Sequence, residues 1–189
     1  MHAAGRMSPA TRFADWKAGL CAGLIAGLID QGLLILLMLA QGASPWIASR
    51  ATAAILLGPG VLEGPERGGS ILAAAFVVHF ALSLVYGLVI AALIRQRSAG
   101  EGIAIGIAFG LAVWVLNYFV VAPSAFPWFV PMRAAPMTPA LHAVFGLAAA
   151  GAYLALRTSE RRRGFERRHV PRKVTVERRG FDDRRSLAA

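Results

Sequence analysis

The chain has 189 residues, of which 57% are hydrophobic and only 16% are charged, and its formal net charge is +10. Between residues 18 and 156 most charged side chains fall in short interruptions between long apolar stretches. A soluble domain spreads its charges over its surface, so this segregation excludes an ordinary soluble domain. Cys21 is the single cysteine, which excludes an intrachain disulfide.

Four apolar stretches are long enough to cross a bilayer, which takes about 20 residues at about 1.5 Å each. We place them at about 18–40, 71–94, 102–122 and 138–156. The first exceeds the apolar core of a secretory signal, and no small-residue cleavage site stands out after it, so we expect a retained helix. The predicted fold is all-α: a polytopic membrane protein with a four-helix transmembrane bundle at 18–156.

The distribution of Lys and Arg predicts the orientation of the bundle. With four spans, segments 1–17, 95–101 and 157–189 lie on one side and carry all but three of the 20 basic residues. The exceptions are Arg50, Arg67 and Arg133. By the positive-inside rule both termini are predicted to be cytoplasmic. The membrane therefore explains the net charge, and we expect no nucleic-acid partner.

Two segments on the predicted outer side have distinct compositions. Residues 44–60 are too few for a fifth span, and Pro45 favours a short helix lying on or in the outer interface. Arg50 on this helix is expected to extend toward water. Residues 122–139 contain five prolines, so they cannot form a regular helix throughout.

Glycine recurs every fourth residue in two of the predicted spans. The first ridge is Gly19, Gly23 and Gly27, and the second is Gly102, Gly106 and Gly110. Such ridges let helix backbones approach closely. We favour packing within the bundle over a homodimer face, because four helices must first pack with each other; homo-oligomerisation stays open.

The segment 157–189 is strongly basic and contains a short duplication, RRGFERR at 162–168 and RRGFDDRR at 178–185. It has too few apolar residues for a core, so we expect disorder or a short induced helix. Its charges either fix orientation and aid solubility, or contact anionic lipid headgroups or a partner. The candidate contact residues are Arg161, Arg162, Arg163, Arg167, Arg168, Arg172, Lys173, Arg178 and Arg179.

Asp30 stands inside the first predicted span. A carboxylate at the centre of a transmembrane helix costs about 2.5 to 3.5 kcal/mol, so it should face the bundle or water and have a partner. The candidate partners in the spans are Gln31, His79, Asn117 and His142.

Counted from the outer ends of their predicted spans, Asp30, His79, Asn117 and His142 all lie in the outer half of the membrane, where they would form an outward-facing polar cavity if they converge. Ser83 and Tyr86 continue the face of His79 and would point a path inward. The candidate cavity residues are Asp30, Gln31, His79, Ser83, Tyr86, Asn117 and His142.

Three interpretations of this polar set remain open. The first is hydrogen bonding between helices, the second a pathway for protons, ions or a small solute, and the third a metal or haem site. Bis-histidine haem would need His79 and His142 at similar depth, and they are offset by about four residues. We therefore expect no metal and no cofactor.

Signatures of soluble enzymes are missing. The sequence contains no HExxH, GxSxG or CxxC motif, and GPGVLEGPERGGS lacks the GK[ST] ending of a phosphate loop. We therefore predict that the protein is not an enzyme.

Several phrases resemble one family when they are taken in order. They are ASPW, RATAAILLGPGVL, VVHFALSLVYGLV, NYFVVAPSAFPWF and HAVFGLAAAGAY. Over roughly residues 15–156 the chain is similar to a family of small, four-span bacterial inner-membrane proteins, mostly hypothetical, some automatically labelled sodium:proline symporter. The resemblance implies a bacterial inner-membrane location and no particular activity. Sodium-coupled symporters contain two inverted repeats with broken helices, which need far more than 189 residues.

Two functions are consistent with the sequence. The first is a non-enzymatic membrane protein whose outward-facing cavity handles protons, cations or a small solute. The alternative is a membrane-anchored scaffold or regulatory protein whose basic tail binds anionic lipid or a partner.

Overall fold

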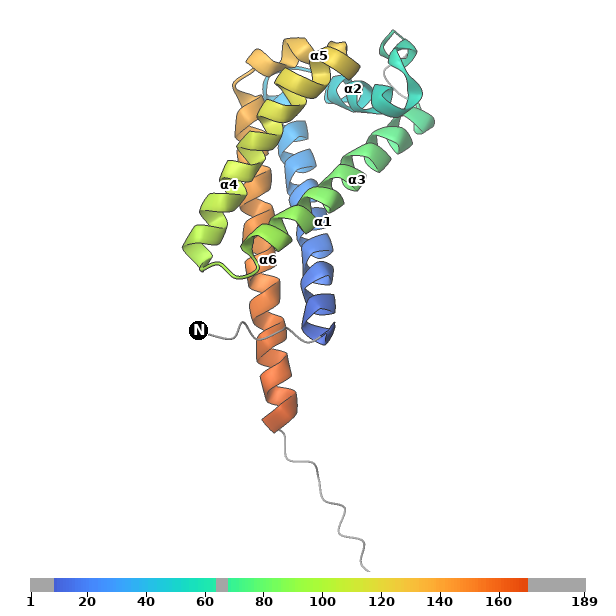
Figure 1. Cartoon of the computed structure of the whole chain (residues 1–189). Helices are drawn as coiled ribbons and strands as arrows, with labels where there is room; N and C mark the ends of the chain where they lie inside the picture. Colours follow the sequence, from blue (N-terminus) through green and yellow to red (C-terminus); the bar gives the residue numbers. More distant parts are fainter. Residues whose placement is uncertain (1–8, 64–67, 170–189) are drawn as a thin grey trace, which may run out of the picture.

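The computed structural model describes residues 9–63 and 68–169, with side chains at 16–63 and 68–157 (Figure 1). This part of the chain is helical and contains no strand, which confirms the predicted all-α class. The elements in chain order are α1 (Pro9–Ala40), α2 (Trp46–Leu57), η1 (Pro59–Leu62), α3 (Gly69–Ile94), α4 (Ala99–Val115), η2 (Leu116–Val121), α5 (Ala122–Ala125), η3 (Pro127–Ala134) and α6 (Met137–His169).

Four helical segments are long and apolar enough to cross a membrane. They are Trp16–Ala40, Gly69–Ile94, Ala99–Ala125 and Met137–Arg157, each within three residues of its predicted bounds. The third segment is not one regular helix, because it joins α4, the π-helical turn η2 and the short α5. The chain is therefore a multi-pass membrane protein.

Three pairs of the long helices form the main contacts of the bundle. The helix α1 packs against both α3 and α6, and α6 also packs against α4. In Figure 1, α3 ends and α4 begins at the same short turn, and the two helices diverge from it toward the end of the bundle where α2 and α5 lie. The turn ends at Ser98, whose hydroxyl caps α4 while Glu101 accepts from the Ser98 backbone N–H at 3.0 Å.

The first glycine ridge forms the contact between α1 and α3. A Cβ atom added at Gly87 of α3 would lie 2.5 Å from the Cα of Gly23, which is closer than real side chains approach. Gly19 and Gly27 lie against Ala91 and Ser83 in the same seam. The ridge therefore packs within the molecule, as the sequence predicts.

The second ridge packs α4 against α6. Gly106 and Gly110 lie against the backbone of Gly146, and a Cβ at Gly106 would also lie 2.5 Å from the Cβ of Ala150. Gly102 meets the side chain of Leu154 at the end of the same seam. Packing within the bundle is thus confirmed for both ridges.

Arg157 ties the turn between α3 and α4 to α6. Its guanidinium donates to the carbonyls of Ile94 at 2.9 Å, of Arg95 at 2.8 Å and of Arg97 at 2.8 Å. Ile94 is the last residue of α3, where helix carbonyls lack a partner within the helix, and Arg95 and Arg97 lie in the turn that follows. The arginine also lies over the Tyr153 ring, 5.8 Å from its centroid. These contacts hold α3 and α4 together at this end of the bundle.

The two segments 44–60 and 122–139 have the predicted local structure. The helix α2 begins directly after Pro45 and buries Ala51, Ala53 and Ala54, packing against α3. Arg50 donates to the carbonyl of Leu62 at 2.7 Å instead of only extending toward water. The proline-rich stretch 122–139 contains the short α5, the 3-10 helix η3 and the start of α6, so the expectation that it cannot be regular helix throughout is confirmed.

Of the two expectations for the tail, disorder or a short helix, the helical one describes its first part. The helix α6 continues past the bundle to His169 without a break (Figure 1). A helix already formed in the bundle adds one hydrogen bond per added residue, so it extends without a new nucleation cost. The candidate contact residues from Arg161 to Arg168 lie on this extension, where side chains are not described, and those from Arg172 to Arg179 lie outside the described residues.

Candidate binding cavity

A cavity of about 790 Å³ lies between the diverging helices. Its walls come from α1, α2, α3, α4 with its π turn, η3 and α6. This volume falls within the range of about 300 to 1,000 Å³ that is typical of sites for small molecules. The cavity exists because α3 leans away from α4 while both remain joined at the opposite end.

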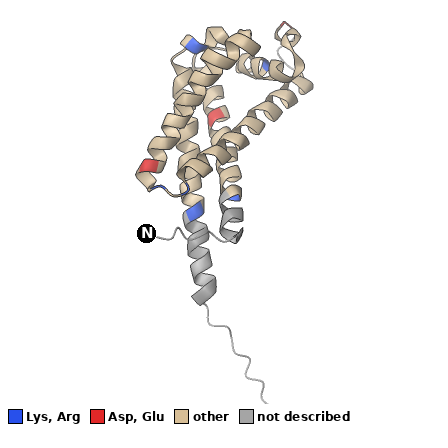
Figure 2. Ribbon diagram, viewed as in Figure 1, with Lys and Arg blue, Asp and Glu red and all other residues tan. Residues whose placement is uncertain are grey.

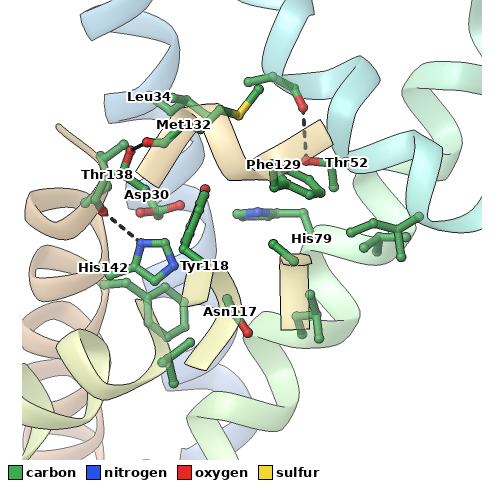
Figure 3. A pocket seen from close by; sticks show the side chains of 18 of the residues that line it. Asp30, Leu34, Thr52, His79, Asn117, Tyr118, Phe129, Met132, Thr138 and His142 are labelled. Atoms are coloured by element: carbon green, nitrogen blue, oxygen red, sulfur yellow. Dashed lines mark hydrogen bonds between the residues drawn. The ribbon is translucent and has the colours of Figure 1, made fainter. Parts of the chain in front are cut away.

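Six of the seven sequence-predicted cavity residues line this one space, although they come from four different helical segments (Figure 3). Gln31 is the exception and does not line it. It follows Asp30 directly on α1, and successive residues on a helix point about 100° apart. The residues that line the cavity are Asp30, His79, Ser83, Tyr86, Asn117 and His142.

Asp30 lies midway along the first span, and its side chain is partly buried in the cavity wall. Figure 2 shows an acidic position on α1 inside the bundle, away from the two ends of the bundle, where the other described charges lie. Asp30 is also the one formally charged side chain among the described residues that line the cavity. The cavity thus combines a mainly apolar wall with one acidic group.

The expected polar partner of Asp30 is not found. Among the residues whose side chains are described, none donates a hydrogen bond to its carboxyl group or forms an ion pair with it. His79 and His142, the expected partners, pair with backbone carbonyls instead, as described below. The carboxyl group therefore faces the cavity, where the Tyr118 side chain lies beside it without forming a hydrogen bond to it.

His79 is held by the neighbouring helix. Its Nε2 atom lies 2.9 Å from the carbonyl oxygen of Gly27. A carbonyl can only accept, so Nε2 carries the proton and the neutral ring keeps an acceptor lone pair at Nδ1. The close α1–α3 seam at Gly27 makes this bond reachable. The Phe80 ring packs edge-on against the imidazole at 5.1 Å between centroids.

His142 is fixed within its own helix. Its Nδ1 atom lies 2.9 Å from the carbonyl oxygen of Thr138, one turn earlier on α6. By the same reasoning Nδ1 carries the proton, and the neutral ring keeps its acceptor lone pair at Nε2. The Tyr118 ring packs edge-on against it at 5.8 Å between centroids.

The inner end of the cavity is closed by aromatic rings. Tyr86 packs edge-on against Phe109 at 5.9 Å and against Phe145 at 6.2 Å between centroids. Ser83, one turn before Tyr86 on the same face, donates its hydroxyl to the His79 carbonyl at 2.8 Å. The predicted inward path along α3 therefore ends at an aromatic floor.

The outer end is covered by η3 and α2. Trp128 donates its indole N–H to the Ala51 carbonyl at 3.1 Å, which ties the two segments together. Thr138 donates to the Met132 carbonyl at 2.8 Å and fixes the end of η3 to α6. The sequence pattern alone does not predict this contact.

Tyr118 is a cavity residue that the sequence did not single out. It follows Asn117 in the π turn, where the wider helical turn brings both neighbouring side chains to the cavity. Its ring contacts Phe129 of η3 at 6.2 Å between centroids. Figure 3 shows Tyr118 between Asp30 and His79. An aromatic residue beside an intramembrane asparagine was the available signal.

Within the described ranges, no group of three or more His, Cys, Asp or Glu side chains is close enough to hold one metal ion. Both cavity histidines also use one ring nitrogen on a backbone carbonyl. The polar groups of the cavity therefore surround an open space and do not converge on one position for a metal ion.

Comparison of the chain with models of protein families, with curated proteins and with solved structures gave no match. Four membrane-spanning helices establish contact with a lipid bilayer. Any function assigned to the cavity therefore depends on the side chains that line it.

Proposed function

We propose that the protein binds a small positively charged solute in this cavity, from the outer side of a bacterial inner membrane, with Asp30 as the counter-ion. The observation that carries the proposal is the Asp30 carboxyl group, which lies in the cavity wall and forms no hydrogen bond or ion pair with a described side chain. A cation in the cavity would supply the missing partner.

The magnitude of the interaction supports a cation over a neutral solute. Opposite charges about 4 Å apart attract by about 4 kcal/mol at an effective dielectric constant of about 20. That gain is comparable to the cost of about 2.5 to 3.5 kcal/mol of placing the carboxylate in the span. A neutral solute would not offset the cost of placing the carboxylate in the span.

The distribution of basic residues supports an outward-facing cavity. The cavity lies at the end of the bundle that carries α2 and η3, whereas the segments rich in Lys and Arg adjoin the opposite end. The positive-inside rule then puts both termini in the cytoplasm and the cavity toward the outer leaflet.

Binding or transport fits the cavity better than catalysis. Ser83 donates its hydroxyl to a backbone carbonyl and not to either imidazole, so it is not set up as an activated nucleophile. We therefore assign the protein a non-enzymatic role.

Family membership is part of the proposal. The ordered phrases between residues 15 and 156 support placing the chain among the small four-span bacterial inner-membrane proteins. Three of those phrases contain His79, Asn117 and His142, each of which lines the cavity.

A ligand-dependent stability measurement tests the proposal. Purified protein in detergent is melted in sodium, potassium or 2-phenylethylammonium chloride at equal ionic strength. A cation present at a hundred times its Kd stabilises the folded protein by about 2.7 kcal/mol. At least one of the three cations should therefore raise the Tm of the wild type. Asp30→Asn should abolish the shift.

Gln31→Leu is the matched control, because Gln31 neighbours Asp30 on α1 but does not line the cavity. This variant should keep the wild-type response. If no cation shifts the Tm, or if the shift survives in Asp30→Asn, the proposed function is wrong.

The extension of α6 favours a second candidate function. The helix carries the basic stretch beyond the bundle as far as His169, where it can present charge to anionic headgroups or to a partner. In that case the bundle serves as an anchor for a scaffold or regulatory protein.

Deletion of residues 158–189 separates the two functions. The truncated protein should retain the Asp30-dependent cation response if the cavity is the functional site. Loss of a cellular phenotype with an intact, cation-responsive bundle would instead favour the scaffold.

A further inference from the structure

The polar side chains of the cavity share a bonding pattern that the charge of Asp30 alone does not explain. His79, His142 and Ser83 each donate their proton to a backbone carbonyl, at 2.9, 2.9 and 2.8 Å. Their donors are thereby used within the protein. The neutral rings and the hydroxyl therefore present acceptor lone pairs to other groups.

The cavity therefore offers acceptors, together with one carboxyl group. Asn117 and Tyr118 can donate as well as accept, but no Lys or Arg lines the space among the described residues. A ligand that donates several hydrogen bonds and carries a positive charge matches this set. Buried acceptors that stay unmatched are costly, so the number of donors on the ligand matters.

The rest of the wall determines the body of the ligand. Tyr118, Phe129, Tyr86 and Phe145 line the cavity, and the aromatic floor closes its inner end. Aromatic faces attract cations and bury apolar surface. A hydrated metal ion would leave this apolar wall uncovered, whereas a hydrophobic organic ion would cover it.

We propose that the cavity is selective for primary ammonium ions with a hydrophobic body, whose N–H groups are shared between Asp30 and the acceptor nitrogens of His79 and His142. This inference rests on the proposed function, since it names the class of cation that the Asp30 site takes. Figure 3 shows these three side chains, with Tyr118, projecting into the same space from four different elements. A quaternary ammonium ion has the charge but no N–H donor, so it satisfies Asp30 and leaves the imidazoles unmatched.

The test compares three probes with the same phenylethyl body by titration calorimetry of the full chain in detergent at pH 8. They are 2-phenylethylamine, its N,N,N-trimethyl derivative and neutral 2-phenylethanol. The primary ammonium ion should bind at least tenfold more tightly than the trimethyl ion, and 2-phenylethanol should bind most weakly. This comparison needs only the wild-type protein, so no variant has to fold.

Two variants then locate the selectivity. His142→Phe keeps a ring but removes the acceptor nitrogen. It should lower the affinity for the primary ammonium ion several-fold and leave the affinity for the trimethyl ion nearly unchanged. Asp30→Asn should lower the affinities for both cations until they approach the affinity for 2-phenylethanol. Gln31→Leu should behave as the wild type.

The outcomes separate this inference from the proposed function. Equal, Asp30-dependent binding of both cations, or tighter binding of the trimethyl ion, would overturn the selectivity and leave cation binding intact. Binding of sodium or potassium but of neither organic cation would have the same consequence. If neither these ions nor the metal ions bind through Asp30, the inference and the proposed function fail together.

Discussion

At the scale of single residues, Asp30 is the most informative position in the chain. It lies inside the first span, lines the cavity and forms no hydrogen bond or ion pair with a described side chain. A protein that needed only helix packing would gain stability by replacing such a group. The two cavity histidines show the opposite arrangement, since each is fixed by a backbone carbonyl.

The substitution Asp30→Asn should therefore stabilise the ligand-free protein. Asparagine has almost the same shape and no charge, so the change removes up to about 3 kcal/mol of unfavourable charge burial. Thermal unfolding in detergent without added amine gives the comparison. A lower Tm in Asp30→Asn would mean that the carboxyl group already has a stabilising partner in the free protein.

At the scale of the elements, two glycine seams hold helices at backbone contact. Their four-residue spacing was visible in the sequence, and it correctly predicted packing within the molecule. The span bounds were also predictable, because apolar runs of sufficient length are separated by charge or proline.

The site was harder to predict than the elements. Periodicity gives the face of each helix but not the order of helices around the bundle or their tilt, and the cavity results from the divergence of α3 and α4. Tyr118 was missed because it enters the cavity through a π turn that a regular helical period does not contain. Gln31 was wrongly included for its closeness to Asp30 in sequence.

The substitution Gly23→Ala should destabilise the bundle. The new methyl group would collide with the Ser83 carbonyl and the Leu84 backbone of α3, so the two helices must separate at a cost of about 1 to 3 kcal/mol. Thermal unfolding of the purified variant measures the loss.

Gly32→Ala is the matched control on the same helix. Nothing lies within 4 Å of a Cβ at that position, so the variant should be as stable as the wild type or slightly more stable. Equal destabilisation by the two substitutions would contradict the proposed seam between α1 and α3.

At the scale of the whole molecule, the structure separates two ends with different chemistry. One end closes tightly, with Arg157 bound to three carbonyls of the α3–α4 turn. The other end holds the cavity under a cover of η3 and α2, joined by Trp128 and the Ala51 carbonyl. The basic segments adjoin the tight end, and in the proposed orientation this end faces the cytoplasm.

This orientation predicts the behaviour of reporters fused to the C-terminus. Green fluorescent protein should fold and fluoresce in bacterial cells, and alkaline phosphatase at the same position should be inactive, because both would lie in the cytoplasm. An active phosphatase with a dark fluorescent fusion would place the C-terminus outside and turn the cavity toward the cytoplasm.

The most direct measurement of the central claim is a crystal structure of the full chain with 2-(4-bromophenyl)ethylamine, in which the anomalous signal locates the bromine atom. We expect the bromine atom inside the cavity near the rings of Tyr86 and Phe145, and the ammonium group within hydrogen-bonding distance of Asp30. A bromine atom found only on the outer surface of the bundle, with the Asp30 carboxyl group paired to another side chain, would contradict the role of the cavity as a cation site.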